Sequence, residues 1–566
     1  MRSVITLVSL LVLASLAVWA AATMTEAMSA AAAAATTEAA TEASPPAGGR
    51  AAKSGTLAPL TVAEASDYQR TSSHDEVVSF VEDLIDLGAP VRAETIGKTT
   101  EGRSLYVAIA ADPPVDAPPA PGARDRLVVF IQGNIHAGEI EGKEASLMLL
   151  RDLTLGGASP EVLKRCILVV LPNYNADGND FFGPSSVHRP GQVGPDIVGR
   201  RHNSQNLDLN RDYVKARSTE FPVVLRQVFN RWDPDLFLDL HTTNGSYHGY
   251  ALTYAPPLHP GTPPGPREFT RDRLLPAVRE AMKKRHGYET FDYGNFDRQE
   301  SPTRWSTYDY RARLGWIYAG VRGRIGILSE AYSYAPYQTR VDATYWFMHE
   351  ILRYAAANAE AILAMHREHD RTVLDWARNP DRAPEVAIRA SLAKRETPER
   401  MLIETSSPPP KGKRRRVREG LIYAKELDVW DRFEPEVTVK FPAGYLLPAS
   451  MTEAIEMLEL HGISVRPVTR PFEARGERFT VTKADTVNRR FSGGLQTDIE
   501  VTRRADRVRG TTDHVFVPTA QRQGLLAFHL LEPDAGDSLI VWQRAGIEVK
   551  AGEELPWVRV LDPQGD

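Results

Sequence analysis

Two histidines and one glutamate have the residue types and the spacing of a catalytic zinc site. His136 and Glu139 are three positions apart, and His241 follows about a hundred residues later. Two imidazoles and one carboxylate give zinc three protein ligands and leave the fourth tetrahedral position open for water. Zinc lowers the pKa of that water towards neutrality, which makes hydroxide available at ordinary pH. The set predicts one Zn²⁺ per chain and a hydrolytic reaction.

Short apolar runs predict the strands that position these residues. Each run is continuous, as expected for a strand covered on both faces. His136 and Glu139 follow one run, His241 follows a second and Glu330 follows a third; the runs are 127–131, 236–240 and 324–328. Ligands of open parallel sheets bind where the carboxyl ends of the strands meet. Each residue alone would be an ordinary loop or core side chain, but their common placement favours a site.

The first two thirds of the chain alternate strand and helix patterns. Apolar residues at helical spacing lie between the predicted strands, for example over 220–230 and 274–285. We therefore predict an α/β fold with a mostly parallel or mixed central sheet flanked by helices. A helix over 345–366 is expected to close this domain. The single cysteine, Cys166, begins an apolar run and is expected to be a buried thiol, so cysteine ligands and cysteine nucleophiles are unlikely candidates.

The length of 566 residues predicts more than one domain. Arg2, an apolar stretch and small residues near Ala22 are typical of a signal peptide, and an uncleaved membrane anchor is the alternative, for which the stretch is slightly short. The predicted parts are a signal peptide over 1–22, a disordered Ala/Thr-rich linker over 23–56, a catalytic domain over 57–375, a linker or surface loop over 376–418 and a smaller β-rich accessory domain over 419–566.

The charge of the chain gives no indication of a nucleic-acid partner. The formal net charge is -5 and the isoelectric point about 6.3. A basic run over 411–416 would fit a nuclear signal, but behind an export signal we interpret it as a solvated loop. The expected location is periplasmic or extracellular, with membrane contact only through the signal peptide. The sequence does not indicate an oligomeric state.

Several motifs, in order along the chain, resemble those of the zinc carboxypeptidases, the carboxypeptidase A-like metallopeptidases of family M14. They cover residues 60–365 and are Gly97-Lys-Thr-Thr-Glu-Gly-Arg103, Gly133-Asn-Ile-His-Ala-Gly-Glu139, Pro172-Asn-Tyr-Asn-Ala-Asp-Gly178, Asn206-Leu-Asp-Leu-Asn-Arg-Asp-Tyr213, Leu238-Asp-Leu-His-Thr-Thr243 and Leu328-Ser-Glu-Ala331. The resemblance implies the fold of that family and the hydrolysis of C-terminal residues from peptides or proteins.

The resemblance also implies roles for the three ligands and for the groups that act with them. His136, Glu139 and His241 would bind zinc. Glu330 matches the catalytic glutamate, which takes a proton from the zinc-bound water and delivers it to the departing amine. Arg201 would stabilise the oxyanion, with Arg200 as its rival.

A second group of residues is implied to bind the substrate or support the metal. Asn210 and Arg211 match a pair that grips the substrate's terminal carboxylate, a task that suits the planar guanidinium fork. Asp208 matches a carboxylate that orients the first zinc histidine. The family also uses a mobile tyrosine near the substrate terminus; its distance before Glu330 favours Tyr308, with Tyr310 as its rival, and a packed loop aromatic is the alternative for either. A structural salt bridge to a flanking aspartate is the alternative for Arg211.

Two other functions remain open at this stage. The same zinc set occurs in deacylases of small N-acyl amino acids and in enzymes that trim cell-wall peptides. A non-catalytic binding protein on a peptidase scaffold is the third hypothesis. Such a protein would typically lack a ligand or the general base, whereas this sequence has all of them.

Overall fold

The computed structural model describes residues 58–120, 124–408 and 416–562. Residues Thr56–Asp566 form one compact unit. The predicted signal peptide, the Ala/Thr-rich linker and most of the basic run lie outside the described residues. None of the helices in the described ranges combines the length and the apolar character needed to cross a membrane.

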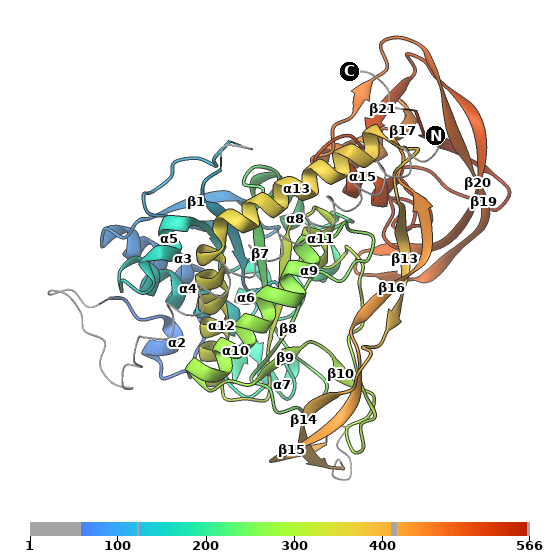
Figure 1. The fold of residues 1–566 in the computed structure, drawn as a ribbon. Coiled ribbons are helices and arrows are strands. Elements are labelled where there is room, and N and C mark those ends of the chain that lie inside the picture. Colours follow the sequence, from blue (N-terminus) through green and yellow to red (C-terminus); the bar gives the residue numbers. More distant parts are fainter. Residues whose placement is uncertain (1–57, 121–123, 409–415, 563–566) are drawn as a thin grey trace, which may run out of the picture. The chain divides into compact units, whose positions relative to one another are not determined.

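An eight-stranded mixed sheet forms the centre of the molecule (Figure 1). Its order is β1-β2-β4-β3-β7-β12-β8-β9. The neighbours β4, β3, β7 and β12 are parallel, as are β8 and β9, and the other pairs are antiparallel. The strands are β1 Val91–Lys98, β2 Ser104–Ala110, β3 Leu127–Gln132, β4 Cys166–Leu171, β7 Leu236–Thr242, β8 Leu252–Ala255, β9 Thr290–Asp292 and β12 Ile325–Ala331. The predicted mixed α/β fold is confirmed.

The inner strands are mostly apolar because both faces of the sheet are covered. In β3, Val128 and Phe130 enter one apolar core while Val129 and Ile131 enter the other. Alternating side chains of a strand point to opposite faces, so a strand between two cores needs an unbroken apolar run. Cys166 at the start of β4 is a free, buried thiol, as predicted.

Helices form the two covering layers. One face carries α3 (His74–Asp86), α4 (Glu141–Thr154), α10 (Leu275–His286) and α12 (Tyr337–Ala357). The other face carries α8 (Glu220–Val224), the π-helix η2 (Leu225–Asn230) and α11 (Gly315–Val321). The capping box predicted before α3 is present, because Ser73 and Glu76 each bond the other's backbone N–H.

The helix predicted over 345–366 is two helices. α12 ends at Ala357 and α13 spans Ala359–Arg378. Between them Asn358 leaves helical geometry, and its side chain donates a hydrogen bond to the carbonyl of Tyr354. An asparagine side chain that competes for backbone groups favours such a break. The apolar spacing continues through this position, so periodicity alone does not reveal the break.

The C-terminal part is rich in β-structure. Its sheets have the orders β10-β11-β15-β14, β13-β16 and β18-β21-β17-β22-β19-β20. The bounds are β10 Asn295–Phe296, β11 Arg304–Ser306, β13 Glu385–Ala393, β14 Glu399–Ser407, β15 Val417–Trp430, β16 Arg432–Lys440, β17 Gly444–Pro448, β18 Arg466–Pro467, β19 Phe472–Phe491, β20 Gly494–Gly510, β21 His514–Pro518 and β22 Glu554–Val560.

The segment predicted as a linker, 376–418, contains two of these strands. β13 pairs with β16, and β14 pairs with β15. One apolar core continues from a face of the central sheet into the C-terminal helices α14 (Thr452–Leu460) and α15 (Gly524–Leu531). The division of the chain into domains stays a prediction.

The remaining elements are short. They are α2 Val62–Ala65, α5 Pro160–Arg165, α6 Ala176–Asp180, β5 Gly183–Pro184, α7 Ser185–His188, β6 Ile197–Val198, the 3₁₀-helix η1 Leu209–Arg211, α9 Pro266–Phe269 and the π-helix η3 Thr270–Leu274.

Candidate active site

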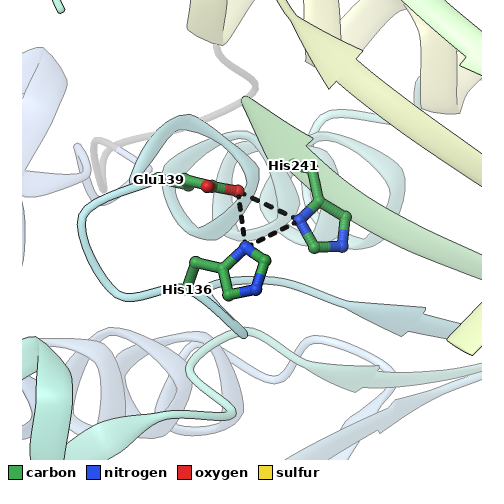
Figure 2. A group of neighbouring side chains, drawn as sticks. All are labelled: His136, Glu139 and His241. Carbon is green, nitrogen blue, oxygen red and sulfur yellow. Dashed lines mark hydrogen bonds and ion pairs between the residues drawn. The ribbon is translucent and has the colours of Figure 1, made fainter. Parts of the chain in front are cut away.

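Three side chains turn their donor atoms towards one point at the carboxyl edge of the sheet (Figure 2). His136 Nδ1 lies 3.1 Å from Glu139 Oε2, and His241 Nδ1 lies 3.0 Å from the same oxygen. The two Nδ1 atoms are 3.2 Å apart. Ligands at about 2.0–2.1 Å from a tetrahedral zinc lie roughly 3.3–3.4 Å apart, so the donor set fits such an ion. All three side chains are buried.

Hydrogen bonds on the outer side of the rings leave both Nδ1 atoms free to bind a metal. His136 Nε2 is 3.0 Å from Asp208 Oδ1, and His241 Nε2 is 3.1 Å from Asp239 Oδ1. A carboxylate that accepts the Nε2 proton fixes the tautomer in which Nδ1 carries the lone pair. Although burial alone would raise it, electrostatic interactions with His136 and Arg189 hold the pKa of Glu139 well below its usual range. The carboxylate is therefore ionised, as a metal ligand must be.

The loop between β3 and α4 carries the first two donors. Its backbone runs so close to its neighbours that a Cβ on Gly138 would lie 2.9 Å from the carbonyl oxygen of Gly199. Only glycine fits at such an approach. His241 lies inside β7 itself, not after it as the sequence suggested. Thr242 N also donates to Glu139 Oε2 at 3.2 Å, which fixes the carboxylate against the end of the strand.

Glu330 lines the same cavity, which has a volume of about 260 Å³. It lies in β12, in register with His241 on the parallel neighbour β7, so both side chains leave the same face of the sheet. Burial is the largest influence on the pKa of Glu330 and raises it to about 8; the interaction with His241 opposes the shift and the negative charge of Glu139 adds to it. A divalent cation in the site would lower this value, towards the range of a general base.

Of the two candidate oxyanion arginines, Arg201 lines the cavity. Its Nη1 lies 3.2 Å from Glu139 Oε1, and its Nη2 lies 2.9 Å from Asp208 Oδ2. Arg200 donates to the carbonyl of Asn203 and stacks on Phe181, with its guanidinium 4.4 Å from the ring centroid. Arg201 therefore faces the metal ligands, and Arg200 is engaged elsewhere.

Asn210 and Arg211, in the 3₁₀-helix η1, both line the cavity but differ in their contacts. Asn210 Oδ1 accepts from Gly315 N, and its Nδ2 lies 3.0 Å from His241 Nε2, so the side chain is held against the candidate metal ligand. Arg211 forms no ion pair with any described residue, flanking aspartates included; its Nη1 donates to its neighbour's carbonyl at 2.7 Å. The guanidinium thus has donors left for a ligand.

Tyr308 and not Tyr310 faces the cavity. Tyr308 is half exposed, and its ring lies 5.9 Å from the Arg211 guanidinium carbon. Tyr310 is buried against Phe433, and its hydroxyl accepts a hydrogen bond from Ala390 N. The half-exposed Tyr308 accepts a hydrogen bond from Arg211 Nη2 at 3.5 Å, whereas the buried Tyr310 is a packing residue.

Two contributors were not predicted. Asp239 precedes His241 by two residues, so both side chains leave the same face of β7. Its charge inside an apolar run was a signal in the sequence, because a buried carboxylate requires a partner. Arg189, in contrast, follows the short helix α7 and donates to Glu139 Oε1 at 2.9 Å. Nothing in its local sequence indicates that role.

Comparison with known proteins agrees with this geometry. Residues 85–243 match the family described as zinc carboxypeptidase, a segment that includes all three candidate ligands. This segment of the chain is similar to the zinc carboxypeptidase family. Glu330, Tyr308 and the C-terminal β-rich region lie beyond the matched segment.

Curated proteins that are similar to this chain include fungal and animal carboxypeptidases. Carboxypeptidase 2 of Trichophyton rubrum is 22% identical over 497 residues, which is 82% of this chain and 81% of that protein. Carboxypeptidase D of Mus musculus is 34% identical over 128 residues, 22% of this chain and 8% of that protein. A solved metallo-carboxypeptidase from Burkholderia cenocepacia is 17% identical, covers 51% of this chain and 70% of its own, and has a TM-score of 0.37.

Proposed function

We propose that the protein is a zinc-dependent carboxypeptidase that removes C-terminal residues from peptides. The observation that carries the proposal is the common cavity of the His136–Glu139–His241 donor set, Glu330 and the guanidinium groups of Arg201 and Arg211. A zinc ion held by the donor set would polarise the scissile carbonyl and lower the pKa of a bound water. The chain's own residues supply the other functions that peptide hydrolysis requires.

Glu330 is the proposed proton carrier. Its carboxylate accepts the proton of the attacking water and passes it to the departing amine. Its position in register with His241 brings it to the ligand set from the neighbouring strand. A general base must lie within hydrogen-bond reach of the proton that it takes, and one with a pKa near the operating pH is most effective.

The two arginines interact with different negatively charged groups of the substrate. Arg201, beside Glu139, stabilises the negative charge that develops on the carbonyl oxygen. Arg211 binds the terminal carboxylate through the donors that no described side chain occupies, and Tyr308 covers this end of the cavity. Asn210, whose Oδ1 accepts from Gly315 N and whose Nδ2 lies against His241, supports the position of that metal ligand. Asp208 has the same role at His136.

The proposed location is outside the cytoplasm, since the first 22 residues have the pattern of a signal peptide. Mass spectrometry of the mature N-terminus from its natural host tests this part. A chain that begins after Ala22 agrees with export behind a cleaved signal peptide, and a chain that retains its first residues contradicts the cleavage.

A paired-substrate assay tests the proposed activity. The purified protein is given one peptide series with a free C-terminal carboxylate, the same series with a C-terminal amide, and a set of N-acyl amino acids. A carboxypeptidase releases single residues from the free acids and leaves the amides intact, because Arg211 has no carboxylate to bind in an amide. Hydrolysis of only the N-acyl amino acids would instead favour the deacylase alternative and contradict the proposal.

A further inference from the structure

A second cavity lies at the end of the central sheet opposite the candidate active site. It has a volume of about 440 Å³. Arg124, Asp235 and Arg324 in its wall each lie just before β3, β7 or β12, so it opens at the amino ends of the strands whose carboxyl ends carry the candidate active site. Helix α13 and the loop before α15 complete it; the lining is Arg124, Asp235, Arg324, Leu363, His366, Arg367, Asp370, Arg371 and Arg522.

The charge of this cavity is positive. Its lining has five guanidinium groups and two carboxylates. Two more carboxylates adjoin it: Asp233, which contacts three of the arginines, and Glu368, which pairs with Arg371. The guanidinium groups remain in excess when all four carboxylates are counted. Guanidinium groups are weakly hydrated, and like charges repel one another when they lie close together in a cavity. Water alone therefore stabilises this cluster poorly.

The inner wall contains polar atoms that no described residue satisfies. They are both ring nitrogens of His366 and the Nε atoms of Arg124 and Arg324. His366 is 3% exposed and Arg324 4%. Burial, aided by the positive charge of Arg324, lowers the pKa of His366 to about 3, so the ring is neutral and has an N–H to donate. Buried donors normally have a partner, so a group of them around one cavity points to a ligand.

The mouth of the cavity carries exposed guanidinium groups. Arg367 and Arg371 follow His366 on the same helix and are both exposed. Arg367 forms no ion pair or hydrogen bond with a described residue, so its charge is available to whatever enters. Guanidinium groups bind carboxylates and phosphates in pairs of parallel hydrogen bonds.

We propose that this cavity is a binding site for a multivalent oxyanion, bearing phosphate or carboxylate groups. The anion enters between Arg367 and Arg371 and accepts hydrogen bonds from the unsatisfied donors of the inner wall. Arg324 and Arg124 come from the sheet, His366 from α13 and Arg522 from the C-terminal region, so a bound anion joins three parts of the fold. It therefore stabilises the folded chain without taking part in hydrolysis.

Calorimetric titration of the full-length, zinc-loaded protein tests the site. Inorganic phosphate and citrate are titrated separately, with the ionic strength held constant by sodium chloride, and the tighter ligand shows which oxyanion the cavity prefers. We expect one saturable binding event per chain and a rise of the melting temperature with ligand concentration. Arg367→Glu should weaken binding by about tenfold or more, since it replaces an attractive charge with a repulsive one.

Two further variants locate the bound anion. Arg378→Glu makes the same charge change at an exposed position of α13 outside the cavity and should leave the affinity unchanged. Arg211→Ala removes the proposed carboxylate-binding arginine of the candidate active site and should also leave the affinity unchanged. Equal affinity in Arg367→Glu and the unaltered protein, loss of binding in Arg211→Ala, or no saturable binding of either anion would overturn the proposal.

Discussion

His136 and His241 both turn Nδ1 to the inside of the site because a carboxylate occupies the outer nitrogen of each ring. Asp208 comes from the loop before η1, and Asp239 comes from β7 itself. The two carboxylates therefore set the tautomer of the rings as well as their orientation. This shared arrangement predicts that metal affinity depends on residues that do not touch the metal.

Asp239→Asn tests this dependence. The amide keeps the shape of the carboxylate but carries no negative charge, so it is a weaker acceptor for the hydrogen bond from His241. Zinc affinity should fall about 10- to 100-fold, the usual effect of losing such a partner. Competition against a chromophoric chelator measures the affinity. Asp83→Asn, an exposed change on α3, is the control, and equal affinity of the two variants would contradict the assigned role.

Glu330→Gln tests the proton carrier. The glutamine occupies the same volume but cannot accept a proton, so kcat should fall by about 10² to 10⁴. Zinc content should stay the same, because Glu330 is not one of the three donors. Steady-state kinetics and elemental analysis of the same sample give both values. Peptide hydrolysis at the unaltered rate would reject this mechanism.

Arg211→Ala tests recognition of the terminal carboxylate. Loss of a charge-assisted hydrogen bond costs roughly 1.5–3 kcal/mol, so KM for free-acid peptides should rise about 10- to 100-fold. Because the bond exists before and during the reaction, kcat should change much less. Initial rates over a range of peptide concentrations separate the two constants. A large fall in kcat at constant KM would assign Arg211 to the chemical step instead.

At the scale of elements, a hairpin of the C-terminal region reaches the candidate active site. β19 and β20 are joined by a two-residue turn, Ser492-Gly493, whose positive φ angles of 45° and 85° suit a tight hairpin. Ser492 Oγ accepts from Asp208 N and donates to Asp208 O, both at 3.0 Å. Lys215 Nζ donates to the carbonyl of Ser492 at 2.7 Å. The turn thus holds the backbone of the residue that orients His136.

Ser492→Ala should loosen this support. The change removes both hydrogen bonds to Asp208, each worth about 1 kcal/mol, so zinc affinity should fall about threefold to tenfold. The chelator competition described for Asp239 measures it. Ser450→Ala, at an exposed position of the same region, is the matched control. A variant with unchanged zinc affinity would show that the hairpin contact is not required by the site.

The strands of the central sheet could be predicted because their evidence is local. Each inner strand is a short apolar run, and the three ligands follow from their positions relative to these runs. β13 and β14 could not be predicted in this way. Their side chains are partly exposed, and they form by pairing with β16 and β15 across the chain. Tertiary pairing of this kind leaves no continuous apolar signal.

Prediction of the site from the sequence is limited in the same way, because some of its side-chain contacts come from segments far apart in the chain. Asp239 could have been identified from its charge inside a strand, whereas Arg189 and Ser492 reach the site only through the tertiary fold. The choice of Arg201 over Arg200, and of Tyr308 over Tyr310, also depends on where the loops direct them. Sequence motifs narrowed each choice to two residues, and the geometry distinguishes between the two.

At the scale of the whole molecule, Asp233 links the central sheet to the C-terminal region. Its carboxylate lies 3.4 Å from Arg124 and 3.6 Å from Arg324, and it also pairs with Arg522. Burial would raise its pKa, but these arginines lower it from 3.8 to about 2. The stability of the contact between the central sheet and the C-terminal region therefore depends on the charge of Asp233.

The pH dependence of unfolding tests this coupling. Because the pKa of Asp233 is lower in the folded chain than in the unfolded chain, its contribution of about 2 kcal/mol is present above about pH 4 and is lost as the pH falls through about 2. In Asp233→Asn the free energy of unfolding should be lower at neutral pH and should change less between pH 4 and 2. Urea unfolding across this range measures it. Asp83→Asn should behave as the unaltered protein, and parallel pH curves for Asp233→Asn and the unaltered protein would contradict the account.

Metal content tests the central claim most directly. Elemental analysis of the purified, full-length protein should find one zinc per chain, and His241→Ala, prepared in the same way and shown to be folded, should retain little of it. A protein that binds no divalent metal, or a His241→Ala variant that keeps a full equivalent of zinc, would contradict the account.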